Sequence, residues 1–308
     1  MNTTELTFGI VFLFQMGTGL SGNIFLLLFY ARMAFASPKL SPSDLGLAHL
    51  ALANTIILLT FGIPETMSAW GWRNFLDSAG CKFIMYLFRV ARSLAICSTC
   101  LLSMFQAITI SPGTPRWAWI KARLPRCVVP SCLLSWGHSL LVDSDVLVNM
   151  TGPQNRSVQL MLDFKYCSKI STSAEVILLI TFVRSFCDVF FVVLMSAASG
   201  YMVFVLHRHH QQVRHLHTPG QSPRVMPEVR AAKRVVALAT LYILLYGRQT
   251  IMFSVLLNMR EKSFLLVTSH MVLGFTFSAV SPLLMIHSDR RIRRFWKKES
   301  PDARVSHS

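Results

Sequence analysis

The sequence predicts an all-α integral membrane protein, a single bundle of seven transmembrane helices that occupies residues 1–308. Seven mostly apolar stretches run along the chain, and a bilayer core takes about 20 helical residues to cross. The chain is 53% hydrophobic and only 14% charged, whereas soluble domains carry about 25% charged residues. Because lipid offers the backbone no hydrogen-bonding partner, each stretch must be a helix.

The connections between these stretches are short and leave little room for a second domain. The fifth stretch is too long for the bilayer, so we expect it to project into the cytosol. The predicted spans are Leu6–Tyr30, Leu45–Met67, Cys81–Ile108, Cys127–Val148, Ala174–Leu206, Ala231–Asn258 and Ser263–His287.

Small residues and prolines predict where individual spans pack closely, break or kink. Gly17–Gly22 in the first span permits close helix packing, and Asn23 can hydrogen-bond across helices. Pro38 and Pro42 break the chain before the second span. Prolines inside the second, fourth and seventh spans are expected to kink their helices; they are Pro64, Pro130 and Pro282.

The distribution of basic residues predicts the orientation in the membrane. Basic residues at the very ends of spans are counted with the adjoining loops. Of the 30 Lys and Arg residues, nineteen then lie after the first, third and fifth spans and in the tail, seven lie on the other side, and four lie deep within spans. By the positive-inside rule the N-terminus is outside and the C-terminus cytosolic, as in a multi-pass plasma-membrane protein. The net charge of +16 is therefore explained by the basic residues on the cytosolic side, and no nucleic-acid partner is expected.

Sequons and cysteines agree with this orientation. Asn149 and Asn155 begin acceptor sequons in the predicted outer loop before the fifth span and are candidate glycosylation sites. Cys81 opens the third span on the outer face and Cys167 lies in the same outer loop, on the oxidising side. We expect these two to form a disulfide that holds the loop over the mouth of the bundle.

No pattern in the chain points to catalysis. The sequence contains no phosphate-binding loop, HExxH, GxSxG or kinase signature, and no cofactor is expected. We interpret the histidine-rich run His207–His217 as a solvated basic loop; the alternative is a metal site. Cys97 and Cys100 have redox spacing, but on an apolar helix they are buried structural thiols.

Several segments resemble a known family. The segment His49–Asn54 (HLALAN) resembles the NLxxAD stretch of rhodopsin-like G-protein-coupled receptors, Gly22-Asn23 resembles their GN pair, and Ser281-Pro282 takes the place of NPxxY. Four segments resemble the vomeronasal type-1 pheromone receptors more specifically: Gly62–Met67 (GIPETM), Cys100–Pro112 (CLLSMFQAITISP), Ala198–Val203 (ASGYMV) and Arg208–His217 (RHHQQVRHLH).

The departures from the rhodopsin-like pattern concern the cytosolic switch. Gln106 stands where most such receptors have the arginine of DRY, and Asn54 replaces a sodium-binding aspartate, so a sodium site is doubtful. Asn54 and Pro282 are expected to be structural, as an interhelical hydrogen bond and a hinge. The residues expected at the G-protein-coupling surface are Gln106, Arg208, Arg214, Arg230, Lys233 and Arg234.

Seven ionisable residues fall at comparable depth inside the predicted spans: Arg89, Arg92, His138, Arg184, Asp188, Arg248 and His270. A charge in a membrane helix costs roughly 2.5–3.5 kcal/mol on insertion scales, so these positions need an explanation. One interpretation is an internal salt bridge between Arg184 and Asp188, which share a helix face. One anion cannot neutralise the other arginines, so we favour a water-filled pocket that takes an anionic ligand.

The resemblance implies a chemosensory receptor of the pheromone type. It would bind a small extracellular ligand between its helices and activate a heterotrimeric G protein of the inhibitory class. The alternatives are a bitter-taste-like receptor, which the Cys81–Cys167 pair and the Arg208–His217 segment disfavour, and a small-solute transporter. A transporter of this size commonly shows inverted repeats with broken helices, and no such pair is found.

Overall fold

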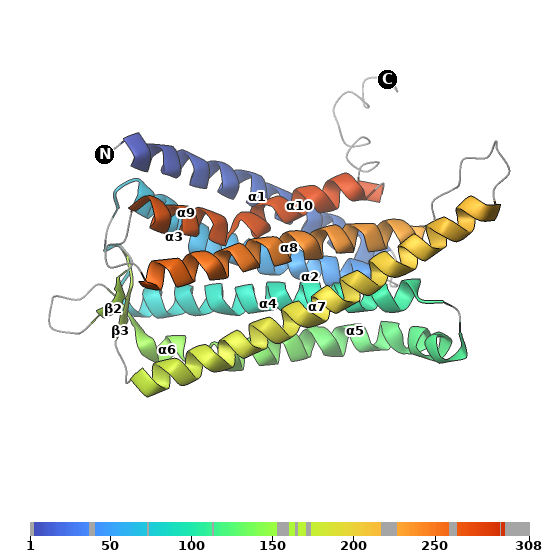
Figure 1. Cartoon of the computed structure of the whole chain (residues 1–308). Coiled ribbons are helices and arrows are strands. Elements are labelled where there is room, and N and C mark those ends of the chain that lie inside the picture. Colours follow the sequence, from blue (N-terminus) through green and yellow to red (C-terminus); the bar gives the residue numbers. More distant parts are fainter. Residues whose placement is uncertain are drawn as a thin grey trace, which may run out of the picture.

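The computed structural model of the chain is a bundle of long helices that run side by side (Figure 1). It describes residues 3–36, 41–72, 74–112, 114–152, 160–163, 166–170, 174–216, 227–258, 264–289 and 291–292. The elements in chain order are α1 (Thr3–Ala36), α2 (Pro42–Ile57), the π-helix η1 (Leu58–Gly62), α3 (Ile63–Ala69), α4 (Ser78–Ile110), α5 (Pro115–Val142), α6 (Val146–Asn149), β1 (Met150–Thr151), β2 (Leu160–Asp163), β3 (Ser168–Ile170), α7 (Ala174–Leu216), α8 (Pro227–Asn258), α9 (Phe264–Gly274) and α10 (Thr276–Ser288).

Five helical stretches are long and apolar enough to cross a membrane, judged by length and composition over the described residues. They are Leu6–Ala36, Pro42–Ala69, Ser78–Ile110, Leu178–Gln211 and Ser269–Ser288. The helices α5 and α8 hold the places of the fourth and sixth predicted spans and have 28 and 32 residues. Both begin with segments rich in basic residues, which shortens their apolar part.

Two predicted spans are interrupted helices. The second passes from α2 through η1 into α3, and Pro64 is the second residue of α3. Proline cannot donate the backbone hydrogen bond of an α-helix, and a π-turn at this point is one way in which a helix accommodates that loss. The seventh span breaks at Phe275 (φ −120°, ψ 9°) into α9 and α10.

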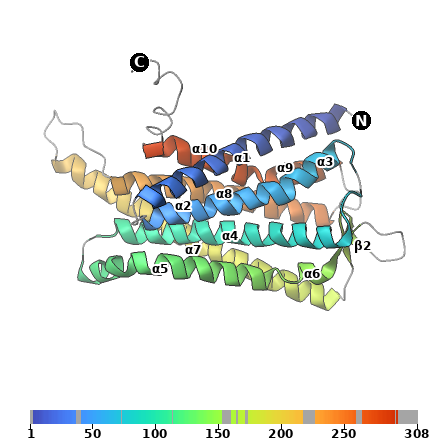
Figure 2. The same cartoon turned by 180° about the vertical axis from the view of Figure 1, so that it is seen from behind.

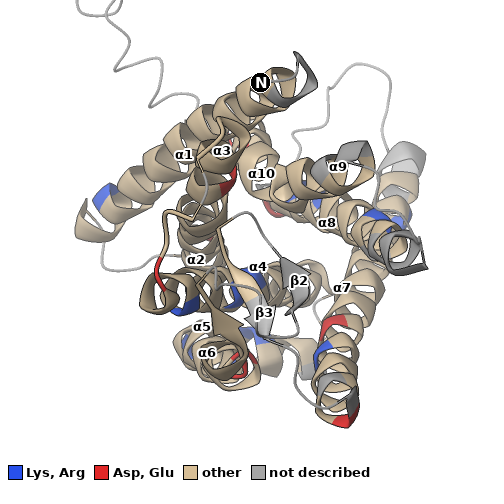
Figure 3. Ribbon diagram, turned by 90° about the vertical axis from the view of Figure 1, so that its left-hand side faces the viewer, with Lys and Arg blue, Asp and Glu red and all other residues tan. Residues whose placement is uncertain are grey.

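The helix α4 lies at the centre of the bundle. It contacts α2, α5, α7 and α8, and the view along the helices shows it among these four (Figure 3). From behind, α2, α4 and α5 run next to one another (Figure 2). Large apolar side chains such as Phe14, Leu134 and Phe186 remain exposed on the outside of the bundle, as expected of a surface that faces lipid.

Buried amides join the helices, as the small and polar residues of the first span predict. Asn23 is fully buried and donates to the carbonyl oxygen of Ser278 at 2.9 Å. Asn54 donates to Ser281 Oγ at 3.0 Å, beside Pro282, which confirms its expected role in an interhelical hydrogen bond. These hydrogen bonds join α1 and α2 to α10. They help to fix how the helices are rotated against one another, which apolar packing alone specifies poorly.

A small antiparallel sheet follows α6, with strand order β1-β3-β2. The disulfide between Cys81 and Cys167 attaches it to the start of α4, with the two Cα atoms 5.8 Å apart; the predicted pairing is confirmed. The buried Tyr166 also donates to Glu65 Oε1 of α3 at 2.8 Å. We call this end of the bundle the disulfide end. The opposite end, which carries Arg208, Lys233, Arg234 and Arg291, is called the basic end.

Candidate ligand-binding site

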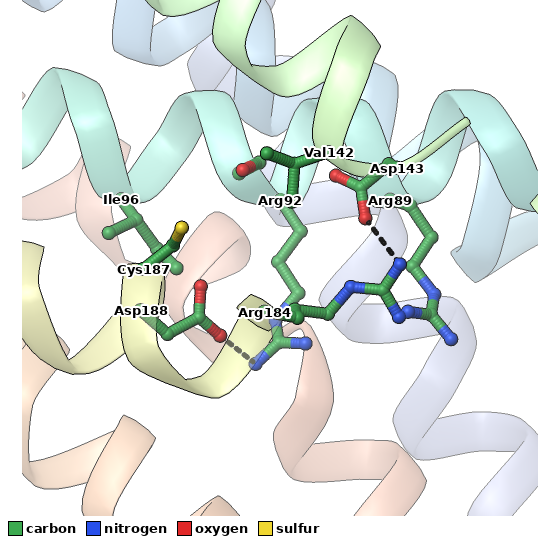
Figure 4. Close-up of a pocket in the computed structure, with 9 residues that line it drawn as sticks. Arg89, Arg92, Ile96, Val142, Asp143, Arg184, Cys187 and Asp188 are labelled. Carbon is green, nitrogen blue, oxygen red and sulfur yellow. Dashed lines mark ion pairs between the residues drawn. The ribbon is translucent and has the colours of Figure 1, made fainter. Parts of the chain in front are cut away.

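A polar cavity lies between α4, α7 and the end of α5, toward the disulfide end (Figure 4). Arg89, Arg92 and Ile96 share one face of α4 because residues three and four positions apart lie on the same side of a helix. The same spacing brings Arg184, Cys187 and Asp188 to one face of α7. The lining consists of these residues with Ser93, Val142 and Asp143.

Ion pairs cross the cavity from helix to helix. Arg92 Nη2 lies 3.7 Å from Asp188 Oδ2, so the pair joins α4 to α7. Arg184 Nη2 lies 3.1 Å from Asp143 Oδ1 and 2.5 Å from Asp145 Oδ1, so it joins α7 to the turn after α5. Tyr246 of α8 donates to Asp188 at 3.4 Å. The cavity is therefore a crossing point of four helices.

This pairing corrects the salt bridge considered for Arg184 and Asp188. The two residues do share a face of α7, but each binds a partner on another element. An arginine that precedes an acid by one turn is the less favourable orientation of an intrahelical pair. Sequence reasoning misses the acids at 143 and 145 because they fall within the predicted fourth span, whereas α5 ends at Val142 and places them in a turn.

Arg89 differs from the other two arginines. It lines the cavity and is partly buried. Within the described part of the chain it has no ion pair inside 4 Å, whereas Arg92 has one and Arg184 has two. Arg89, Arg92 and Arg184 all point into the same space (Figure 4). Among the three arginines that line the cavity, Arg89 is therefore the one whose charge has no ion-pair partner in the described structure.

Three other residues expected at this level lie elsewhere. His138 packs its ring against Phe191, with centroids 5.4 Å apart. His270 lies 3.3 Å from Gln249, where α9 meets α8. Arg248 is exposed on α8. None of the three is among the residues that line the cavity in the described structure.

The coupling and glycosylation candidates are spread over both ends of the bundle. Gln106 is buried and hydrogen-bonds Ser43 of α2, while Arg234 pairs with Asp289 at 2.9 Å. Arg208 and Lys233 are exposed and Arg230 is partly buried. Asn149 is only 6% exposed. The side chain of Arg214 and the whole of Asn155 lie outside the described residues.

The architecture and the cavity together define a class: an α-helical membrane protein with a polar cavity between its helices. Comparison with known proteins gives the family. Residues 6–298 match the model of the vomeronasal organ pheromone receptor family.

Individual relatives agree with that match over most of their length. The chain is 38% identical to vomeronasal type-1 receptor 1 of Gorilla gorilla gorilla, covering 93% of this chain and 81% of the relative. It is 36% identical to vomeronasal type-1 receptor 3 of Homo sapiens (96% and 94% covered). It is 34% identical to olfactory receptor class A-like protein 1 of Danio rerio (92% and 90%).

The chain belongs to the vomeronasal type-1 receptor family. It is thus a multi-pass membrane protein and a chemosensory G-protein-coupled receptor with seven transmembrane helices, and not an enzyme. The family implies a small-molecule ligand and a G-protein partner.

Proposed function

We propose that the receptor sits in the plasma membrane with its N-terminus outside, binds a small ligand carrying an anionic group in the cavity around Arg89, and activates an inhibitory-class G protein. The single observation that carries the ligand proposal is the position of Arg89. It is a cation at a polar cavity whose neighbouring acids are already engaged by Arg92 and Arg184.

An anion suits this site for geometric reasons. Guanidinium groups match carboxylate, sulfate or phosphate oxygens by paired hydrogen bonds. A cation in the ligand would face Arg89 without a free acid to receive it, because Asp188 and Asp143 hold their own arginines. In the present packing the cavity has room for about one water molecule. A ligand with a steroid-like apolar body would therefore have to separate the helices around Ile96 and Val142 in order to bind there.

Binding there supports signalling because the cavity joins separate helices. A ligand shifts a conformational equilibrium only by its differential affinity for the two states. An anion that draws Arg89 toward it competes with Asp188 and Asp143 for the neighbouring guanidinium groups. It thereby weakens the contacts that hold α4, α5 and α7 in the present packing.

The remaining assignments belong to the same proposal. The positive-inside distribution supports a cytosolic basic end, where the exposed Arg208 and Lys233 are offered as G-protein contacts, together with Arg214 and Arg230. Asn155 is the preferred glycosylation site, since the side chain of Asn149 is buried. His138, Arg248 and His270 are assigned no direct contact with the ligand.

The test compares matched pairs of steroid sulfates and their neutral alcohols in cells that express the receptor, with a second-messenger readout. We expect a sulfate to act, and Arg89→Gln to weaken its potency about 10- to 100-fold, since hydrogen bonds to charged groups contribute roughly 1.5–3 kcal/mol. Arg248→Gln is the matched control, because Arg248 is exposed and does not line the cavity.

Equal surface expression of all variants is required. If only neutral members of the pairs act, or if Arg89→Gln and Arg248→Gln shift potency equally, the anion-site proposal is wrong.

A further inference from the structure

Four charged residues cluster at the basic end of the bundle: Asp44, Arg234, Asp289 and Arg291. We call them the basic-end cluster. Asp44 belongs to the first turn of α2, Arg234 to α8, and Asp289 follows α10 directly. The carboxylates are only 2% and 5% exposed, and the Arg234 side chain is 9% exposed.

The hydrogen bonds of the cluster join three elements. Arg291 holds Asp44 with two parallel bonds, Nη1 to Oδ2 at 3.1 Å and Nη2 to Oδ1 at 2.7 Å. The same Nη2 donates to Asp289 Oδ2 at 3.0 Å. Arg234 Nη1 donates to that oxygen at 2.9 Å. Asp289 is thus the shared acceptor that connects α8 to the segment after α10 and, through Arg291, to α2.

The electrostatics keep Asp289 ionised. Burial alone would raise the pKa of Asp289, but the hydrogen bonds from Arg291 and the charge of Arg234 outweigh burial and hold that pKa below its ordinary value. Charge-assisted bonds of this kind are roughly twice as strong as neutral ones. Separating α8 from α10 would leave Asp289 with one guanidinium in place of two.

The first turn of α2 also accepts a hydrogen bond from α4, the central helix of the bundle. Gln106, which stands where rhodopsin-like receptors have the arginine of DRY, donates to Ser43. That bond joins α4 to α2 and does not involve α8. In the described structure, the polar contact between α8 and the end of α10 is the hydrogen bond from Arg234 to Asp289. Apolar packing around Ala232 and Val235 also holds α8 here, and this pair adds a directional polar restraint between α8 and the end of α10.

We propose that the Arg234–Asp289 pair is the restraint that keeps the G-protein-facing end of the bundle closed in the resting receptor. Activation opens the pair and frees the start of α8. Arg234 acts here through Asp289 and is not itself a contact with the G protein. The inference rests on the proposed orientation of the basic end, and it does not depend on what ligand occupies the cavity.

The experiment measures nucleotide exchange without any ligand, in vesicles that contain purified full-length receptor and an inhibitory-class heterotrimer. We expect Arg234→Gln and Asp289→Asn each to raise basal exchange per receptor, roughly 10-fold on the scale of one lost charge-assisted bond. The double variant should exceed the larger single effect little or not at all. Glu228→Gln is the matched control, since Glu228 is an exposed charge in the first turn of the same helix and is assigned no contact with the G protein.

Asp289→Asn also weakens the hydrogen bonds of Arg291 to Asp289. If that variant fails to fold, the basal exchange of Arg234→Gln alone tests the proposal. Arg234→Lys keeps the charge and is expected to stay close to wild type. Basal exchange in Arg234→Gln equal to that of Glu228→Gln would overturn the proposal. So would a decrease, which would make Arg234 a contact with the G protein. Because no ligand is present, failure of the anion site would leave this result unaffected.

Discussion

Individual charged residues inside the bundle are stabilised by partners on other helices. An arginine in a membrane helix costs roughly 2.5–3.5 kcal/mol on insertion scales, and Arg92 and Arg184 offset this cost by pairing with Asp188, Asp143 and Asp145. Arg89 has no such pair in the described structure, and a charge held inside a membrane bundle commonly marks a functional site. Arg89 is therefore the residue on which we expect ligand binding to depend most.

At the same scale, the Cys81–Cys167 disulfide should determine whether the loop with the sheet stays in place. Loss of a native disulfide commonly costs about 2–5 kcal/mol in small secreted domains. We expect Cys81→Ser and Cys167→Ser to lower surface expression and thermal stability equally, and the double variant to be no worse than either. Cys127→Ser should match wild type, because Cys127 is a free and exposed thiol.

If the two single variants differ clearly in surface expression or thermal stability, or if the double variant loses more than either, the two thiols act separately and do not form a disulfide.

The residues of the cavity could be predicted in part. Arg89, Arg92, Arg184 and Asp188 follow from the rule that intramembrane charges mark functional positions, and the structure does bring them together. Their partners could not be assigned, because helix rotation and the exact end of α5 decide which acid faces which arginine. An Asp-Ser-Asp triplet at residues 143–145 at the end of an apolar stretch was the available signal for that end.

Among the elements, the interrupted helices distinguish this bundle from seven straight rods. The change from α2 through η1 to α3 is attributable to Pro64, but the break at Phe275 lies seven residues before Pro282 and has no proline of its own. Hydropathy locates an apolar stretch well, since transfer from water to lipid sums over many residues. It does not locate an interruption, which depends on the local backbone geometry and packing.

The Asn54–Ser281 bond should contribute measurably to the packing of α2 against α10. Asn54 is fully buried, so Asn54→Ala leaves the Ser281 hydroxyl without its donor and should destabilise the receptor by about 1–3 kcal/mol. Thr55→Ala is the matched control, since Thr55 donates to the Ala51 carbonyl of its own helix at 2.8 Å. The measurement is the thermal midpoint of the detergent-solubilised protein.

A midpoint for Asn54→Ala no lower than that of Thr55→Ala would show that the interhelical bond contributes nothing of its own.

At the scale of the whole molecule, α4 links the two ends of the receptor. This helix has 33 residues, or about 50 Å at 1.5 Å per residue. It carries Arg89 and Arg92 at the cavity and Gln106 at the basic end. A ligand that changes how α4 packs against α7 at one end can therefore alter contacts at the other. On our proposal, the basic-end cluster is the element with two arrangements that such a switch needs: paired as in this structure, and open after activation.

The most direct test of this account reconstitutes the purified receptor with an inhibitory-class heterotrimer in vesicles and measures binding of a GTP analogue. The account predicts that a steroid sulfate which binds the receptor saturably also raises the rate of nucleotide exchange. Saturable sulfate binding with no change in exchange, or sulfate flux into the vesicles without exchange, would contradict it.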